Sequence, residues 1–242
     1  MSESTRGKRF LTTHWSVVLA AGSSEATESH TALSTLCQTY WPPVYSFIRS
    51  RGSDGETARD LTQGFFTSLL EKRGLRAARQ ERGRFRNFLL ASLKNYLAHE
   101  RERAQAQKRG GGQTLIRFDR DPEESFFTPC EPAASDTPET IFERRWATSL
   151  LDQAMLDLGA EMERTRNRER FETLRAFLVS DTDPPYAELA RELRMTESAV
   201  RVQLHRMRQR FGAVLRECVV QTLDDTGNVD DELRYLIGLL GA

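Results

Sequence analysis

The sequence predicts an all-α protein built from two small helical domains, joined by an acidic linker that contains proline and glycine. Apolar residues recur at spacings of three and four along most of the chain, and no stretch alternates apolar and polar residues as a strand would. With 242 residues, of which 38% are hydrophobic, the chain is long enough to bury two cores. We expect the two domains at 30–110 and 138–222, with the linker between them at 111–137. An N-terminal extension would occupy 1–29, and a C-terminal amphipathic helix would occupy 223–242.

The N-terminal half should contain helices at about 12–20, 31–48, 56–72 and 84–103. Pro42-Pro43 should kink or split the second of these helices, because proline has no amide proton and its ring collides with the carbonyl one turn earlier. In the C-terminal half, Pro138-Glu139 should begin a long helix, since proline is favoured in the first turn.

The third and fourth helices should each have a buried side and an exposed side. In the third, the spacing buries Ala58, Leu61, Phe65 and Leu69 and places Arg59, Asp60 and Gln63 outward. In the fourth, it buries Phe85, Leu89, Leu93 and Leu97. Polar residues of the fourth helix repeat at intervals of seven on another face, at Asn87, Lys94 and Arg101.

A short helix, a tight turn and a longer helix are expected between Tyr186 and Phe211, which would give the second domain a helix-turn-helix. Thr196 should cap the longer helix, because its hydroxyl can accept the free amide protons of the first turn. The apolar stripe of this helix comprises Val200, Leu204, Met207, Phe211 and Val214. The opposite side carries Ser198, Arg201, His205 and Arg208. Such a polar and cationic line suits a major groove, although it also fits an amphipathic hairpin whose basic side faces water.

Charge is unevenly distributed along the chain, although the formal net charge is zero. Twelve Lys and Arg against four Asp and Glu occur in 71–109, and seven against two occur in 191–216. The linker region 119–143 has the opposite balance, with eight acidic residues and one basic residue. Because local fields determine what binds, both basic segments are candidates for nucleic-acid contact.

Other classes of protein have little support in the sequence. Cys37, Cys130 and Cys218 lie far apart without Cys or His partners at ligand spacing, so we expect no disulfide framework, no metal and no cofactor. The four histidines stand apart from any cysteine or paired carboxylates, so we do not expect an enzyme. The polar N-terminus and the lack of a long apolar run predict neither a signal peptide nor a membrane helix, and we expect a cytoplasmic protein.

Three segments together resemble bacterial RNA polymerase sigma factors of the extracytoplasmic-function type, which have only regions two and four. They read ARDLTQGFF at 58–66, FRNFLLASLKNYL at 85–97 and YAELARELRMTESAVRVQLHRMRQRF at 186–211. The resemblance covers roughly 30–110 and 138–220, and its specificity comes from the presence of both modules in this order. It implies a protein that binds core RNA polymerase, at the clamp and flap, and directs promoter recognition and opening for transcription initiation.

The resemblance also implies roles for individual residues. Asp60 and Gln63 would contact the clamp. The fourth helix and the connector before it would hold single-stranded DNA of the minus-ten element, for which the candidates are Arg82, Arg84, Asn87, Lys94, Asn95 and Arg101. The helix after Thr196 would read the minus-thirty-five element, with base contacts from Ser198, Arg201 and His205 and phosphate contacts from Arg206, Arg208 and Arg210.

The clamp-docking segment departs from the family, which usually has an acidic residue at the position of Arg59 and commonly another near Gly64. A phosphate on Thr62 would add about 1.5 to 2 negative charges and restore that field. Since serine/threonine kinases govern some members of the family, we expect phosphorylation at Thr62, with Thr67 as a lesser candidate. The sequence does not choose between a kinase and an anti-sigma factor as regulator.

A different class also fits the sequence. A one-component transcription regulator would use the same helix-turn-helix to bind duplex DNA without a sigma role, and its N-terminal half would sense a signal. Such proteins usually form dimers and bind a palindrome unaided, so binding to duplex DNA in the absence of polymerase distinguishes the two classes.

Overall fold

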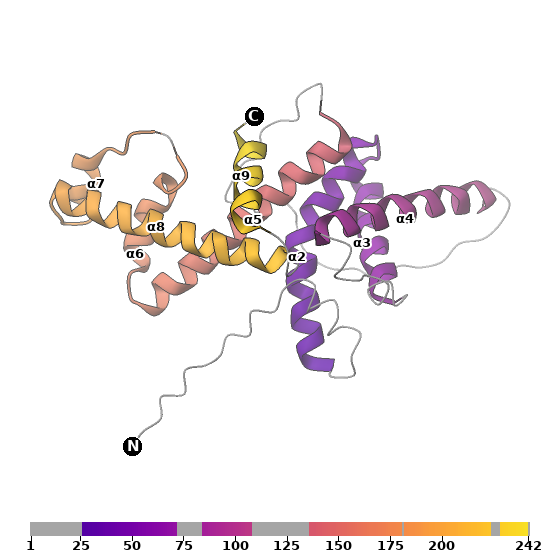
Figure 1. Cartoon of the computed structure of the whole chain (residues 1–242), viewed down its shortest axis with the longest axis horizontal. Helices are drawn as coiled ribbons and strands as arrows, with labels where there is room; N and C mark the ends of the chain where they lie inside the picture. The colour runs from indigo at the N-terminus through magenta and orange to yellow at the C-terminus, as the bar shows by residue number, and fades with distance from the viewer. Residues whose placement is uncertain (1–25, 72–83, 108–135, 181, 224–227, 242) are drawn as a thin grey trace, which may run out of the picture. The chain divides into compact units, whose positions relative to one another are not determined.

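Every assigned element in the described part of the chain is a helix (Figure 1). The computed structural model describes residues 26–71, 84–107, 136–180, 182–223 and 228–241. Within these ranges the all-α prediction is confirmed. The helix expected at 12–20, residue Arg82 and nearly all of the linker at 111–137 lie outside them.

The helices follow the predicted order. In the N-terminal half they are α2 (Ala26–Ser50), α3 (Gly55–Glu71) and α4 (Phe85–Gln107). In the C-terminal half they are α5 (Pro138–Arg164), α6 (Arg168–Leu174), the short 3-10 helix η3 (Arg175–Phe177), α7 (Tyr186–Glu192), α8 (Glu197–Thr222) and α9 (Val229–Leu240).

Spatial contacts between residues divide the chain into two compact units. One unit contains α3 and α4, and the other contains the C-terminal half of α2 together with α5, α6, η3, α7, most of α8 and α9. The domain boundaries expected from the sequence stay predictions.

The double proline does not split α2, which is one helix from Ala26 to Ser50. Four apolar side chains beside the prolines are fully or almost fully buried, at Tyr40, Val44, Phe47 and Ile48. Burying each such side chain contributes about 1.5–3 kcal/mol, whereas proline inside a helix costs about 3 kcal/mol. Tertiary packing therefore outweighs the splitting that the two prolines favour, while the alternative that they kink the helix stays a prediction.

An aromatic contact joins α3 and α4. The ring of Phe65 on α3 packs edge-on against the ring of Tyr96 on α4, with centroids 5.7 Å apart. Gly64 gives the Tyr96 hydroxyl its space, because a Cβ atom at position 64 would collide with Oη. All four apolar positions predicted for α4 are buried.

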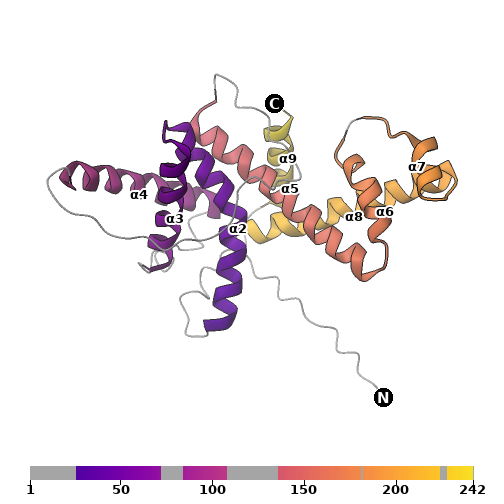
Figure 2. The same ribbon diagram turned by 180° about the vertical axis from the view of Figure 1, so that it is seen from behind.

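The other unit is organised around α5. Thr137 caps this helix by accepting a hydrogen bond from the Thr140 amide at 3.2 Å, so α5 begins at Pro138 as predicted. Phe142 of α5 packs edge-on against Phe47, with ring centroids 6.4 Å apart. The C-terminal helix α9 lies against α5 in both views (Figure 1 and Figure 2), and Asp230 at its start pairs with Arg216 of α8.

Candidate nucleic-acid interface

The turn between α7 and α8 is set by hydrogen bonds at both ends. The Met195 amide donates to the Ala190 carbonyl at 2.9 Å and the Arg194 amide donates to the Arg191 carbonyl at 3.4 Å, which is a Schellman ending of α7. Arg194 has a φ of 52°, the left-handed conformation that this ending requires. On the other side, the Ala199 amide donates to the Thr196 hydroxyl at 3.2 Å. Thr196 therefore caps α8 as predicted.

The N-terminal half of α8 has a buried side and an exposed side. All five residues of the predicted apolar stripe are buried, from Val200 to Val214. We call the exposed side the α8 face and define it by Ser198, Arg201, Val202, His205, Arg206 and Arg208. Val202 was missed by the sequence reasoning, which treated polar side chains alone as base-reading candidates. Its side chain is 50% exposed between cationic neighbours, where it can contact a thymine methyl group.

Arg201 is held in place by an aromatic ring. Its guanidinium carbon lies 3.8 Å from the centroid of the Tyr186 ring at the start of α7, and its Nη2 atom lies 3.9 Å from a carboxylate oxygen of Glu197. The distance to Glu197 is too long for a hydrogen bond, so that contact leaves the N–H donors of Arg201 available. The arginine is 58% exposed, and its donors can therefore reach a ligand.

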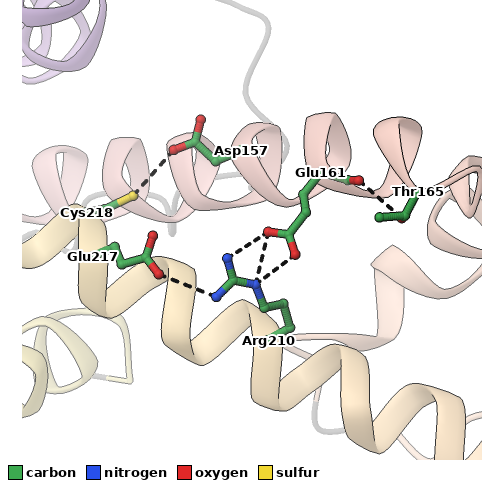
Figure 3. Close-up of polar contacts among 6 residues, drawn as sticks. All are labelled: Asp157, Glu161, Thr165, Arg210, Glu217 and Cys218. Carbon is green, nitrogen blue, oxygen red and sulfur yellow. Dashed lines mark hydrogen bonds and ion pairs between the residues drawn. The ribbon is translucent and has the colours of Figure 1, made fainter. Parts of the chain in front are cut away.

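Two further arginines of α8 are bound within the protein. Arg208 donates from Nε and Nη2 to the Phe177 carbonyl oxygen at 3.0 and 2.8 Å, which leaves its remaining N–H groups for a phosphate. Arg210 donates to both carboxylate oxygens of Glu161 on α5, at 2.8 to 3.0 Å, and to Glu217 at 3.4 Å (Figure 3). The hydrogen bonds to Glu161 raise the pKa of Arg210.

Arg210 therefore has an internal role that its predicted phosphate contact did not include. Its guanidinium joins α8 to α5 as a bidentate ion pair and also reaches Glu217, so two carboxylates neutralise its charge and compete with a phosphate. Directly after Glu217, the Cys218 thiol lies 3.9 Å from an Asp157 oxygen (Figure 3). Burial, with a smaller contribution from Asp157, raises the pKa of this thiol to about 12.

The second candidate surface is on α4. Asn87, Lys94, Asn95 and Arg101 are exposed, as predicted, whereas Arg84 is half-buried. Small exposed residues, Ala91 and Ala98, lie between them and leave room for a ligand to approach the helix. Arg103 of the same helix pairs with Glu100 at 3.0 Å, which lowers the local positive field towards the C-terminal end of α4. We call the exposed candidates Asn87, Lys94, Asn95 and Arg101 the α4 face.

The segment of α3 that was expected to dock on the polymerase clamp differs from the predicted pattern. Asp60 is exposed as predicted, and Leu61, which was expected to face inward, is half-buried. Gln63 is only 6% exposed, so its expected outward position was wrong. Thr62 is 0% exposed, and its hydroxyl donates to the Ala58 carbonyl at 2.7 Å. A kinase cannot reach this hydroxyl in the folded protein, so phosphorylation at Thr62 is withdrawn. Thr67, the lesser candidate, is half-buried.

The glycine at position 64 has a packing explanation. Any side chain at this position would begin with a Cβ atom that overlaps Tyr96 Oη. The contact between α3 and α4 therefore favours glycine at position 64.

The described residues contain no group of three or more His, Cys, Asp and Glu side chains that could hold a metal ion. Among the helices of the described ranges, none is long and apolar enough to cross a membrane. Comparisons with models of known families, with curated proteins and with solved structures found no match.

Proposed function

We propose that this protein is a bacterial sigma factor of the extracytoplasmic-function type, which binds core RNA polymerase and directs promoter recognition and opening. The observation that carries the proposal is the α8 face. Its polar and cationic side chains are exposed on one side of a helix whose other side is buried, and a capped turn after a short helix presents the N-terminal end. This arrangement suits insertion into a major groove.

Within this proposal the residues of the α8 face divide into two groups. Ser198, Arg201, Val202 and His205 lie in the first three turns of α8 and would contact base edges of the minus-thirty-five element. Arg206 and the free donors of Arg208 would contact phosphates, which position the helix without reading sequence.

The α4 face supports the second part of the proposal, which is promoter opening. Its Lys and Arg side chains would follow the backbone of the displaced strand, while Asn87 and Asn95 offer donors and acceptors to an unstacked base. The proposed partners are promoter DNA and core RNA polymerase, through its clamp and flap. Asp60 is the exposed acidic candidate for the clamp, whereas Gln63 would need a rearrangement of α3 to take part.

The test is transcription initiation by the purified full-length chain with core polymerase on a promoter library. We expect selection of a common sequence, and loss of about 1–3 kcal/mol of discrimination at one base pair in Arg201→Ala. Arg206→Ala should weaken binding to all sequences and reduce the salt dependence by about one charge. Arg170→Ala, an exposed arginine of α6, is the matched control and should leave both properties unchanged.

Two results would contradict the proposal. If the chain selects palindromic duplex DNA without polymerase and gives no initiation with it, the one-component regulator is the correct class. If it neither binds DNA nor supports initiation, the α8 face is a solvated helix surface.

A further inference from the structure

We infer that Tyr186 is a specificity-determining positioning residue, which holds the guanidinium of Arg201 so that its edge is presented to one base pair. This inference rests on the proposed function and adds a residue to the reading apparatus that lies outside the longer helix. Tyr186 is the first residue of α7, and its half-buried ring lies 3.8 Å from the Arg201 guanidinium carbon.

The geometry favours this role because an arginine has two ways to interact. Its face stacks on an aromatic ring, and its edge carries the N–H donors. Stacking on Tyr186 occupies the face and leaves the edge for the O6 and N7 acceptors of guanine, which arginine can contact with two hydrogen bonds. The same ring therefore fixes the arginine and leaves its recognition chemistry intact.

The contact of Arg201 with Glu197 is too weak to hold the arginine side chain in one conformation. Glu197, one turn earlier on α8, lies 3.9 Å from Nη2, and both side chains are more than half exposed. Ion pairs of this kind contribute little, because water screens the charges and the long side chains lose conformational freedom. Without the ring, Arg201 would sample many rotamers and would lose entropy on binding.

The position of Tyr186 relative to α8 is itself set by the turn. The Schellman ending at Arg194 and the Thr196 cap join the two helices with four connecting residues. Tyr186 therefore reaches α8 from the opposite end of α7, and the stacking contact is a tertiary contact across the turn. Periodicity within α8 cannot reveal it.

The experiment is a double-mutant cycle on the full-length chain with core polymerase. Discrimination is the ratio of affinities for the selected promoter and for each single-base variant of it. Tyr186→Leu removes the ring face, Tyr186→Phe keeps it, and both are compared in the wild-type and Arg201→Ala backgrounds. Tyr235→Leu on α9 is the matched control for loss of a partly exposed tyrosine.

We expect Tyr186→Leu to lower discrimination about 2- to 5-fold at the base pair affected by Arg201→Ala and at no other, which is the factor expected from an exposed cation–π contact. Tyr186→Phe and Tyr235→Leu should behave as wild type. In the Arg201→Ala background, Tyr186→Leu should have no further effect. Circular dichroism of each variant checks that the helices remain folded.

The inference is overturned if Tyr186→Leu leaves discrimination unchanged while Arg201→Ala removes it, or if its effect persists without Arg201. If Tyr186→Leu does not fold, the NMR chemical shifts of the Arg201 side-chain protons test the inference instead. In the wild-type protein and in Tyr186→Phe they should be shifted upfield by the ring, and unshifted resonances overturn the inference. A wild-type chain that selects no DNA sequence overturns the proposed function and this inference together.

Discussion

Replacing Gly64 by alanine should destabilise the protein, although alanine is the better helix former. The gain in helix propensity is about 1 kcal/mol. Against it, the new Cβ atom would overlap Tyr96 Oη, and the ring cannot easily move because it packs against Phe65 with centroids 5.7 Å apart. Overpacking of this kind costs about 1–3 kcal/mol. We expect a net loss of about 1 kcal/mol in the free energy of unfolding.

The same change should become stabilising when the hydroxyl of Tyr96 is removed. In Tyr96→Phe the nearest remaining atom is the ring carbon Cζ at 3.5 Å from the added Cβ, which is an ordinary contact. Gly64→Ala should then raise the free energy of unfolding by about 1 kcal/mol. Gly212→Ala on α8, where no heavy atom lies within 4 Å of the new Cβ, is the matched control and should give the same gain.

Urea unfolding followed by circular dichroism measures these differences, and hydrogen exchange of the α3 and α4 amides assigns them to the correct unit. The reasoning is refuted if Gly64→Ala stabilises the wild-type protein as much as Gly212→Ala does. It is also refuted if the effect of Gly64→Ala is the same with Tyr96 and with phenylalanine at this position.

Three further predictions concern the unit that contains α5 and most of α8. Arg194→Gly should raise the free energy of unfolding by about 1 kcal/mol, because Arg194 has a positive φ of 52° in the Schellman ending of α7. Arg166→Gly should give the same gain, because Arg166 follows α5 with a φ of 58° and the Asn167 amide donates to the Met162 carbonyl in the same type of ending. If urea unfolding shows no gain for either variant, the left-handed backbone at these positions is not strained. Glu161→Gln should lower the melting temperature, because it breaks the bidentate ion pair with Arg210 at a cost of about 1 kcal/mol. The loss should be smaller in high salt, where the charges are screened. An unchanged melting temperature at low salt would argue against the pair. Since the pKa of the Cys218 thiol is raised from 9.0 to about 12, the unfolded chain releases its proton first, so stability should fall between about pH 9 and pH 12. Cys218→Ala should flatten this decline in a series of urea titrations, and an equally steep decline would show that another group causes it.

The sequence predicted the elements whose signals are local. In α8 the apolar spacing identified every buried position from Val200 to Val214, because a long helix with one buried side repeats with the helical period. Thr196 could be recognised as a cap because capping needs only a hydroxyl and the next three amides, all within one turn. The start of α5 was likewise predicted from Pro138, although its cap Thr137 was not recognised from the sequence.

Sequence periodicity was less informative on α3, where the buried side is wide. Gln63 is buried there although its spacing and polarity predicted exposure, and Thr62 is buried although the predicted phosphorylation needs an accessible hydroxyl. Threonine can satisfy its hydroxyl on the preceding turn, so its burial leaves no trace in the sequence. Neighbouring helices determine how much of the circumference of a helix is buried. The sequence of that helix alone therefore does not predict the width of its buried side.

What the sequence determined by itself is therefore the helical class, the order of the helices and the exposed cationic sides of α4 and α8. Only the tertiary structure decided which of those cations are engaged within the protein. Arg201 stacks on Tyr186, Arg208 binds a carbonyl and Arg210 pairs with Glu161. The physical reason is that these partners are contributed by other helices, at separations from 15 to 49 residues along the chain, and a periodic pattern reports only on the neighbours within a few turns.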